Sequence, residues 1–128
     1  MADPAGAFSG ARVLVAEDEY LLADDLVRAL RDAGAEPVGP VATVAQAEAE
    51  IRAGGLDAAV LDMNLRGEPA FALAARLAAA RVPCVIVSGY SEQAISTMVA
   101  GVRRLEKPVS TEVVIVALAE EMRAAARG

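Results

Sequence analysis

The sequence contains no His and no Trp, it has one Cys, and aromatic residues make up only 3% of its 128 residues. Without His, the chain has no imidazole for acid–base catalysis and no residue that could carry a phosphohistidine. The single Cys84 excludes an internal disulfide and a thiolate zinc site, and its apolar surroundings indicate a buried structural thiol. A core with so few rings is built from aliphatic side chains, as where helices pack on a parallel sheet.

Positive charge and long apolar runs are also scarce. Lys and Arg number 12 against 18 Asp and Glu, a formal net charge of −6, so the chain has no basic surplus for nucleic-acid phosphates. No run approaches the ~20 apolar residues of a membrane-spanning helix. The first ten residues show no basic segment followed by an apolar one, as a signal peptide would. We therefore expect a cytoplasmic protein without nucleic-acid or membrane partners.

The hydrophobic content, at 55%, is well above that of disordered chains, and the length suits one domain. We expect a flexible N-terminal lead over residues 1–10 and one folded domain over residues 11–127. Only Arg127 and Gly128 follow the last predicted helix, so we expect no output domain in the chain.

Short apolar runs alternate with amphipathic stretches along the chain. The apolar runs predict strands at about 13–16, 36–41, 58–62, 82–87 and 102–105, the second at a sheet edge because it contains Pro37 and Pro40. The stretches between them predict five helices: one ending at Gly34, one opened by Thr43, one from Pro69 to about Ala80, one over about 92–100, and one capped by Ser110. Such alternation predicts an α/β fold with a parallel sheet covered on both faces.

In open sheets of this kind, ligands bind beyond the carboxyl ends of the strands. The residues there are Glu17 and Asp18 after the first strand, Asp62 at the end of the third, Ser88 after the fourth and Lys107 after the fifth. Each alone has a simpler interpretation: a helix cap for Asp18, a turn for Asp62, a structural hydroxyl for Ser88 and a solvated lysine for Lys107. Together, they indicate a functional site.

Clustered carboxylates repel one another unless a cation lies among them, and an oxygen-only site suits Mg²⁺. A carboxylate can also attack phosphorus to form an aspartyl phosphate, a reaction that depends on positioning and charge neutralisation. In this interpretation Mg²⁺ and Lys107 supply the positive charge and the Ser88 hydroxyl bonds a phosphoryl oxygen.

From about Arg12 to Ala125, the chain resembles the receiver domain of bacterial response regulators. The resemblance rests on VLVAEDE, AVLDMNLRG, VIVSGY and RRLEKPV, in this order. It implies a flavodoxin-like, doubly wound, five-stranded sheet in the order 2-1-3-4-5 with five helices. It also implies Asp62 as phosphoacceptor, Mg²⁺ held by Glu17, Asp18, Asp62 and the Asn64 carbonyl, Ser88 as switch hydroxyl, Lys107 as phosphate partner, and a cis Lys107–Pro108 peptide.

Two departures from the receiver pattern affect the expected switch. Receivers usually carry Tyr or Phe three residues before the lysine, and here that position is Arg104. The Ser-Gly-Tyr after the fourth strand resembles an atypical single-domain subgroup without the aromatic switch, so we expect Tyr90 and its loop to move instead. A ring packed on a helix end is the alternative for Tyr90. Arg104, Val114 and Leu118 are candidate partner contacts. The alternative for Arg104 is an edge-strand charge that prevents sheet pairing, and plain core packing is the interpretation that we favour for the two apolar residues.

The resemblance implies a phosphorylation switch served by a sensor histidine kinase or a histidine phosphotransfer protein. It would signal to a downstream protein, as a monomer or weak dimer, and would not be an enzyme beyond its own phosphorylation and dephosphorylation. Alternatives are a phosphate sink for a kinase and a partner-binding module that never accepts phosphate. A phosphatase acting on free substrate would need an acid where Asn64 stands.

Overall fold

The computed structural model describes residues 4–89 and 102–127. Five parallel strands form one sheet in the order β2-β1-β3-β6-β7. They are β1 (Arg12–Ala16), β2 (Glu36–Val41), β3 (Ala58–Asp62), β6 (Cys84–Ser88) and β7 (Arg103–Glu106). Numbered along the chain, this is the order 2-1-3-4-5, so the doubly wound fold is confirmed.

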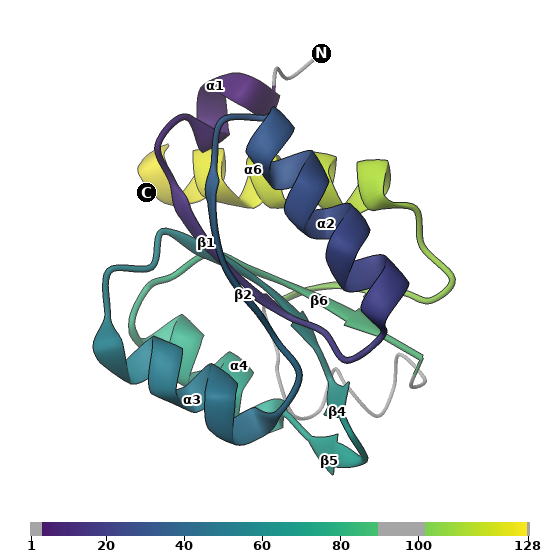
Figure 1. Ribbon diagram of the computed structural model, residues 1–128. Helices are drawn as coiled ribbons and strands as arrows, with labels where there is room; N and C mark the ends of the chain where they lie inside the picture. Colours follow the sequence, from purple (N-terminus) through teal and green to yellow (C-terminus); the bar gives the residue numbers. More distant parts are fainter. Residues whose placement is uncertain (1–3, 90–101, 128) are drawn as a thin grey trace.

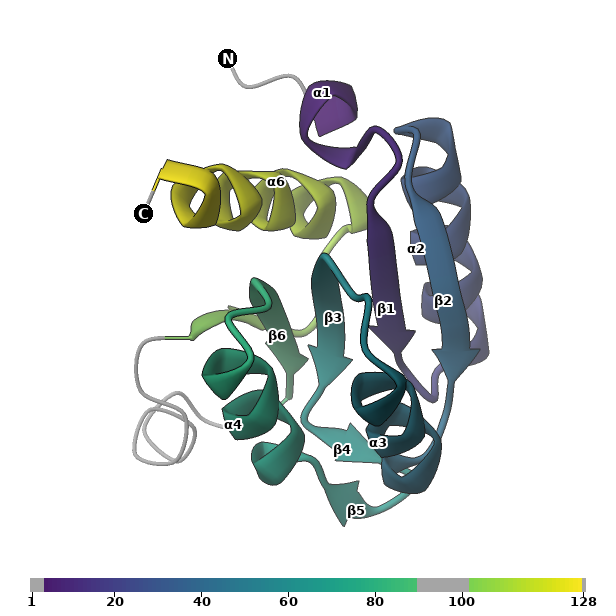
Figure 2. The same cartoon turned by 90° about the vertical axis from the view of Figure 1, so that its left-hand side faces the viewer.

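Helices cover both faces of this sheet. In Figures 1 and 2, α1 (Pro4–Phe8), α2 (Tyr20–Asp32) and α6 (Thr111–Arg127) lie over one face, and α3 (Val44–Ala53) and α4 (Phe71–Ala79) lie over the other. The helix expected at 92–100 falls outside the described residues. Across residues 4–89 and 102–127, no helix is both long enough and apolar enough to span a bilayer.

The period-2 geometry of the strands divides the core into two layers. In β1, Val13 and Val15 pack toward α2 and α6, whereas Leu14 and Ala16 pack toward α3 and α4. The same alternation runs through β3 and β6, where every residue is buried. Strands buried on both faces read as continuous apolar runs, which is why the sequence revealed them.

Local signals in the sequence also mark the edge strand and the helix starts. β2, with Pro37 and Pro40, lies at the sheet edge. The Thr43 hydroxyl accepts a hydrogen bond from Gln46 N at 3.1 Å, and the Ser110 hydroxyl accepts one from Val113 N at 3.2 Å. The Lys107–Pro108 peptide is cis, as the resemblance implied, and a second cis peptide joins Gly39 to Pro40.

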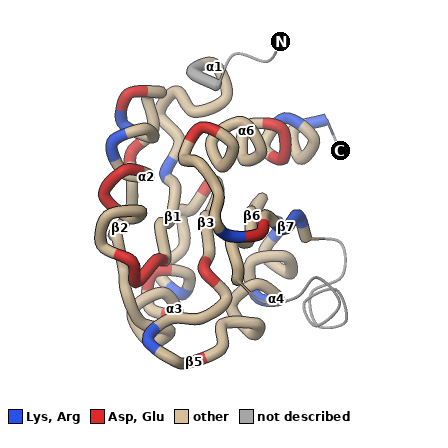
Figure 3. The backbone as a smooth tube through the Cα atoms, turned by 90° about the vertical axis from the view of Figure 1, so that its right-hand side faces the viewer, with Lys and Arg blue, Asp and Glu red and all other residues tan. Residues whose placement is uncertain are grey.

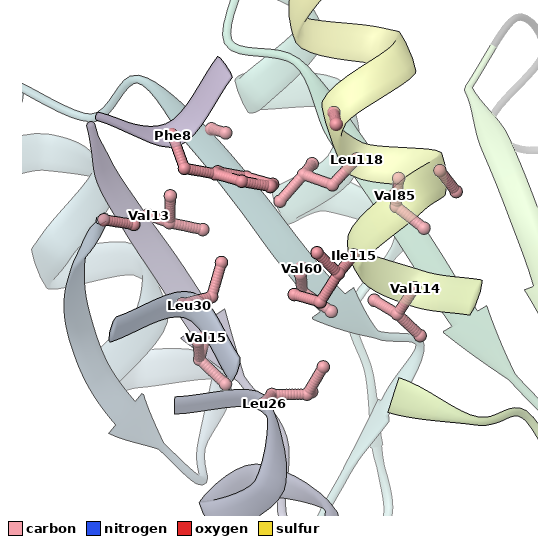
Figure 4. Close-up of a cluster of buried hydrophobic side chains, with 14 of the residues drawn as sticks. Phe8, Val13, Val15, Leu26, Leu30, Val60, Val85, Val114, Ile115 and Leu118 are labelled. Atoms are coloured by element: carbon pink, nitrogen blue, oxygen red, sulfur yellow. The ribbon is translucent and has the colours of Figure 1, made fainter. Parts of the chain in front are cut away.

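The N-terminal segment differs from expectation. Instead of a flexible lead over residues 1–10, residues Pro4–Phe8 form α1, and the Phe8 side chain is fully buried. Figure 4 shows Phe8 directed into the core beside Leu118. Removal of this phenyl ring from water favours the docked position of the five-residue helix.

The segment after β3 also differs. Pro69 was expected in the first turn of a helix, but it lies in β5 (Glu68–Pro69), which pairs antiparallel with β4 (Asn64–Leu65). The connecting residues Arg66 and Gly67 both have positive φ, 52° and 84°. Two consecutive positive φ angles are typical of a type I′ turn, so a small hairpin separates Asp62 from α4.

Candidate functional site

The carboxyl ends of four strands carry the residues that the sequence singled out. Asp62 and Ser88 are the last residues of β3 and β6, Glu17 follows β1 directly, and Lys107 follows β7. Because the strands are parallel and in register, these ends meet at one edge of the sheet. In Figure 3, the acidic segment after β1 and the acidic end of β3 both lie toward this edge.

Glu17, Asp18 and Asp62 form a compact acidic cluster. One carboxylate oxygen of each lies within 4.8 Å of those of the other two. Glu17 and Asp62 are buried, with 3% and 5% of their surfaces exposed, whereas Asp18 is partly exposed. Three carboxylate donors, partly open to solvent, fit a hard divalent cation such as Mg²⁺, which keeps some of its waters.

Burial has a clear electrostatic effect on this cluster. Desolvation raises the pKa of Glu17 from 4.5 to about 8, assisted by its hydrogen bond with Asp62 and the negative charge there. The backbone N–H of Glu19 and the charge of Lys107 act in the opposite direction. A carboxyl whose pKa is raised this far gives up its proton when a cation arrives.

The Lys107 side chain brings a positive charge to the acidic cluster. Its Nζ lies 2.9 Å from Asp62 Oδ2, 3.4 Å from Glu17 Oε2 and 2.5 Å from Glu19 Oε2. Partial burial alone would lower its pKa, but the hydrogen bonds to Glu19 and Asp62 and the charges of Asp62 and Glu17 raise it overall. Lys107 is therefore a permanent positive charge beside the Asp62 carboxylate.

The β4–β5 hairpin orients the carboxylates through backbone N–H groups. Asn64 N donates to Asp62 Oδ1 at 3.0 Å, and Arg66 N donates to Asp18 Oδ2 at 2.7 Å. The Asn64 side chain accepts from Gly67 N at 2.7 Å, which closes the turn. The hairpin thus connects two members of the acidic cluster, while a metal contact from the Asn64 carbonyl stays a prediction.

Ser88 is buried beside Lys107. Only 2% of its surface is exposed, and its carbonyl accepts a hydrogen bond from Lys107 N at 2.9 Å. This bond ties the ends of β6 and β7 together, so the hydroxyl residue and the lysine are held on adjacent strands. Tyr90, the expected moving aromatic residue, lies outside the described residues.

The candidate partner role of Val114 and Leu118 on α6 is wrong, and the core packing that we favour for them is confirmed. Val114 and Leu118 are fully buried in the layer that contains Phe8 and Val85, so they are core residues. An apolar row at i, i+4 spacing is the face that a helix turns toward the sheet. The large apolar residues that α6 exposes are instead Val113 and Val116, at 48% and 41%.

Arg104 lies in β7, opposite Ile86 of β6. Its neighbour Arg103 bonds Glu120 of α6 at 2.7 Å, so strand alternation directs Arg104 to the other face of the sheet. Arg104 is partly buried there, and its part in partner binding stays a prediction.

Two features of the site were not foreseen. Glu19 makes the shortest of the Lys107 contacts given above, and its signal was only a third acid in the run Glu17–Glu19. The Arg66 backbone N–H that binds Asp18 had no signal in the sequence, because it depends on the hairpin turn.

The sheet order and the acidic cluster beside Lys107 define a doubly wound α/β protein with a candidate cation site at the carboxyl ends of its strands. Comparison with known proteins gives the family. Residues 13–119 match the model of the response regulator receiver domain. The chain belongs to this family.

Individual relatives agree with this assignment. The transcriptional regulatory protein TcrA of Mycobacterium tuberculosis is 38% identical over 96 residues, which cover 75% of this chain. The match spans only 38% of the TcrA length. SdrG from Sphingomonas melonis Fr1 has 38% identity and a TM-score of 0.72, with 91% of this chain and 98% of that one covered. A response regulator receiver protein from Sinorhizobium medicae WSM419 has 26% identity and a TM-score of 0.82, with 91% and 97% covered.

Proposed function

We propose that the protein is a phosphorylation switch in which the Asp62 carboxylate accepts a phosphoryl group from a phosphohistidine. The observation that carries this proposal is the position of Asp62: buried, 2.9 Å from the Lys107 ammonium, and within a group of three carboxylates that fits a divalent cation. The donor is a sensor histidine kinase or a histidine phosphotransfer protein, which is the partner class of receiver domains.

In the proposed reaction, an Asp62 oxygen forms a bond to phosphorus while the phosphorus–nitrogen bond of the donor breaks. The electron pair of that bond returns to the donor imidazole. Lys107 binds a phosphoryl oxygen and offsets its charge, and the Ser88 hydroxyl donates to another. Glu17, Asp18, Asp62 and the Asn64 carbonyl would hold Mg²⁺, which when bound neutralises negative charge on the phosphoryl oxygens.

The product signals through contacts with other proteins. An aspartyl phosphate adds negative charge at a site bordered by the hairpin, the start of α2 and the end of β7. Added charge of this kind biases loops between two arrangements. We expect no turnover of free substrates, because Asn64 occupies the position where an aspartate phosphatase needs its general acid.

Phosphotransfer from acetyl phosphate in the presence of Mg²⁺ tests this proposal. Intact-mass spectrometry should show an adduct of ~80 Da on the wild-type protein. Asp62→Asn should show no adduct. Asp25→Asn, the same chemical change at an exposed aspartate of α2, should behave as wild type.

An adduct on all three proteins would place the phosphoryl group elsewhere. An adduct on none of them would reject phosphorylation of this chain under these conditions and favour the partner-binding alternative.

A further inference from the structure

We propose that Glu19 is a positioning residue that occupies the Lys107 ammonium in the unphosphorylated protein and gives it up to the phosphoryl group. This inference rests on the proposed phosphorylation of Asp62. It assigns a part in the switch to a residue outside the acidic cluster.

The hydrogen-bond capacity of Lys107 is the first observation. An ammonium group has three N–H donors, and Lys107 faces three carboxylates, those of Glu17, Glu19 and Asp62. Asp62 gives one of its oxygens to phosphorus in the proposed reaction, and a phosphoryl oxygen that bonds Lys107 must still compete with Glu17 and Glu19 for its N–H groups. Phosphorylation therefore requires an exchange of partners at Nζ.

Burial indicates which partner leaves. The side chains of Glu17 and Asp62 are 1% and 6% exposed, whereas that of Glu19 is 60% exposed. A buried carboxylate that loses its cation stays desolvated and costs free energy, whereas an exposed one regains water. Glu19 is the partner whose release costs least.

The backbone at Glu19 is the third observation. Glu19 is the N-cap residue of α2, where an acidic side chain could accept from the free N–H groups of the first turn, but it makes no such cap hydrogen bond. Its carboxylate reaches instead to Lys107, 88 residues along the chain. Its own N–H donates to Glu17 Oε2 at 3.0 Å, which holds the backbone against the acidic cluster.

These observations give a switch with two states. Without phosphate, Glu19 and Asp62 share the Lys107 ammonium. With phosphate, Lys107 bonds the phosphoryl group, and the Glu19 carboxylate is released at the start of α2, directly before the exposed Tyr20 and Leu21. Glu19 therefore lowers the affinity of the site for a phosphoryl group.

The experiment measures the affinity for beryllofluoride, a tetrahedral mimic of the phosphoryl group, in the presence of Mg²⁺. Glu19→Gln should bind it roughly two- to fivefold more tightly than wild type, the range expected for loss of an exposed ion pair. Glu19→Asp keeps the charge but is one methylene shorter, so it loses the reach to Lys107 and should show a similar gain.

Glu106→Gln is the matched control for charge. Glu106 is exposed and precedes Lys107 directly, and it is not among the Lys107 partners given above. It should bind beryllofluoride as wild type does. Amide NMR signals of Tyr20 and Leu21 should shift on binding in wild type, and the Leu21 signal should already lie near its bound position in Glu19→Asp.

Two outcomes would overturn the inference. Affinity unchanged or weaker in Glu19→Gln would show that Glu19 does not compete for Lys107. A gain in Glu19→Gln that Glu19→Asp does not share, or that Glu106→Gln reproduces, would indicate general repulsion between negative charges. If wild type itself fails to bind beryllofluoride, the proposed phosphorylation is at fault.

Discussion

Lys107 Nζ lies 2.9 Å from Asp62 Oδ2, although the two residues are 45 positions apart in the sequence. Asp62 ends β3, a central strand, and Lys107 follows β7, an edge strand, with β6 between them. The lysine therefore reaches across the end of β6 to the carboxylate. The positive charge of Lys107 therefore lies beside Asp62, the residue that we propose as the phosphoacceptor.

We expect pH to control both stability and metal binding through Glu17. Because its pKa is raised to about 8 from 4.5, its contribution to folding is fully present below the unfolded value and is lost as pH rises through about 8. The metal-free protein should lose stability over this range. Bound Mg²⁺ requires the deprotonated form, so the Tm gain from Mg²⁺ should increase with pH.

Thermal unfolding across this pH range, with and without Mg²⁺, checks the expectation. Glu17→Gln is neutral at every pH and should flatten the dependence in the metal-free protein. Glu68→Gln, an exposed glutamate of β5, should keep the wild-type slope. A Glu17→Gln slope equal to that of wild type would assign the pH effect to other groups.

Position 66 in the hairpin turn should accept a residue that favours positive φ more strongly than Arg does. Arg66 has φ of 52°, a region where Asn is favoured over Arg, and its contact with Asp18 uses the backbone N–H. Arg66→Asn should therefore raise the free energy of unfolding by about 0.5–1 kcal/mol and leave Mg²⁺ affinity unchanged.

Gly67→Ala should have the opposite effect on stability from Arg66→Asn, because the Gly67 φ of 84° is costly for a residue with a Cβ. It should lower the free energy of unfolding by about 1 kcal/mol or more. Urea denaturation measures both variants. Destabilisation by Arg66→Asn would mean that the Arg side chain has a structural role that its backbone contact does not explain.

Phe8 should be important for stability even though it precedes the sheet. Removal of a fully buried phenyl ring leaves a cavity, so Phe8→Ala should cost about 3–5 kcal/mol. Leu21→Ala, at a side chain that is 77% exposed, should stay within about 0.5 kcal/mol of wild type. Chemical denaturation measures the stability of both variants. A Phe8→Ala protein as stable as wild type would indicate that the N-terminal segment is only loosely held against the core.

The two faces of α6 should respond differently to truncation. Leu118→Ala should cost about 2–5 kcal/mol because Leu118 is fully buried. Val116→Ala, at a side chain that is 41% exposed, should change stability by no more than about 0.5 kcal/mol. Equal effects on unfolding would contradict the observed orientation of the helix.

Much of the fold could be read from local patterns. β1, β3 and β6 are buried on both faces, so continuous apolar runs marked them, and the prolines of β2 marked the edge. The acids and the lysine at the strand ends could be placed together because parallel strands of one sheet end at a common edge. Here strand periodicity and topology rules were sufficient, and the resemblance to receivers supplied the individual roles.

Other features follow only from contacts between distant segments. The pattern of α6 could not distinguish a row facing a partner from a row facing the sheet, and packing against Phe8 and Val85 decided that Val114 and Leu118 are core. The pairing of Glu19 with Lys107 likewise has no local signal, because 88 residues separate the two in the sequence. Residue order determines periodicity and local turns. The burial of Glu17 and Asp62 and the pairing of Glu19 with Lys107 arise only when the folded chain excludes water from some carboxylates and leaves others exposed.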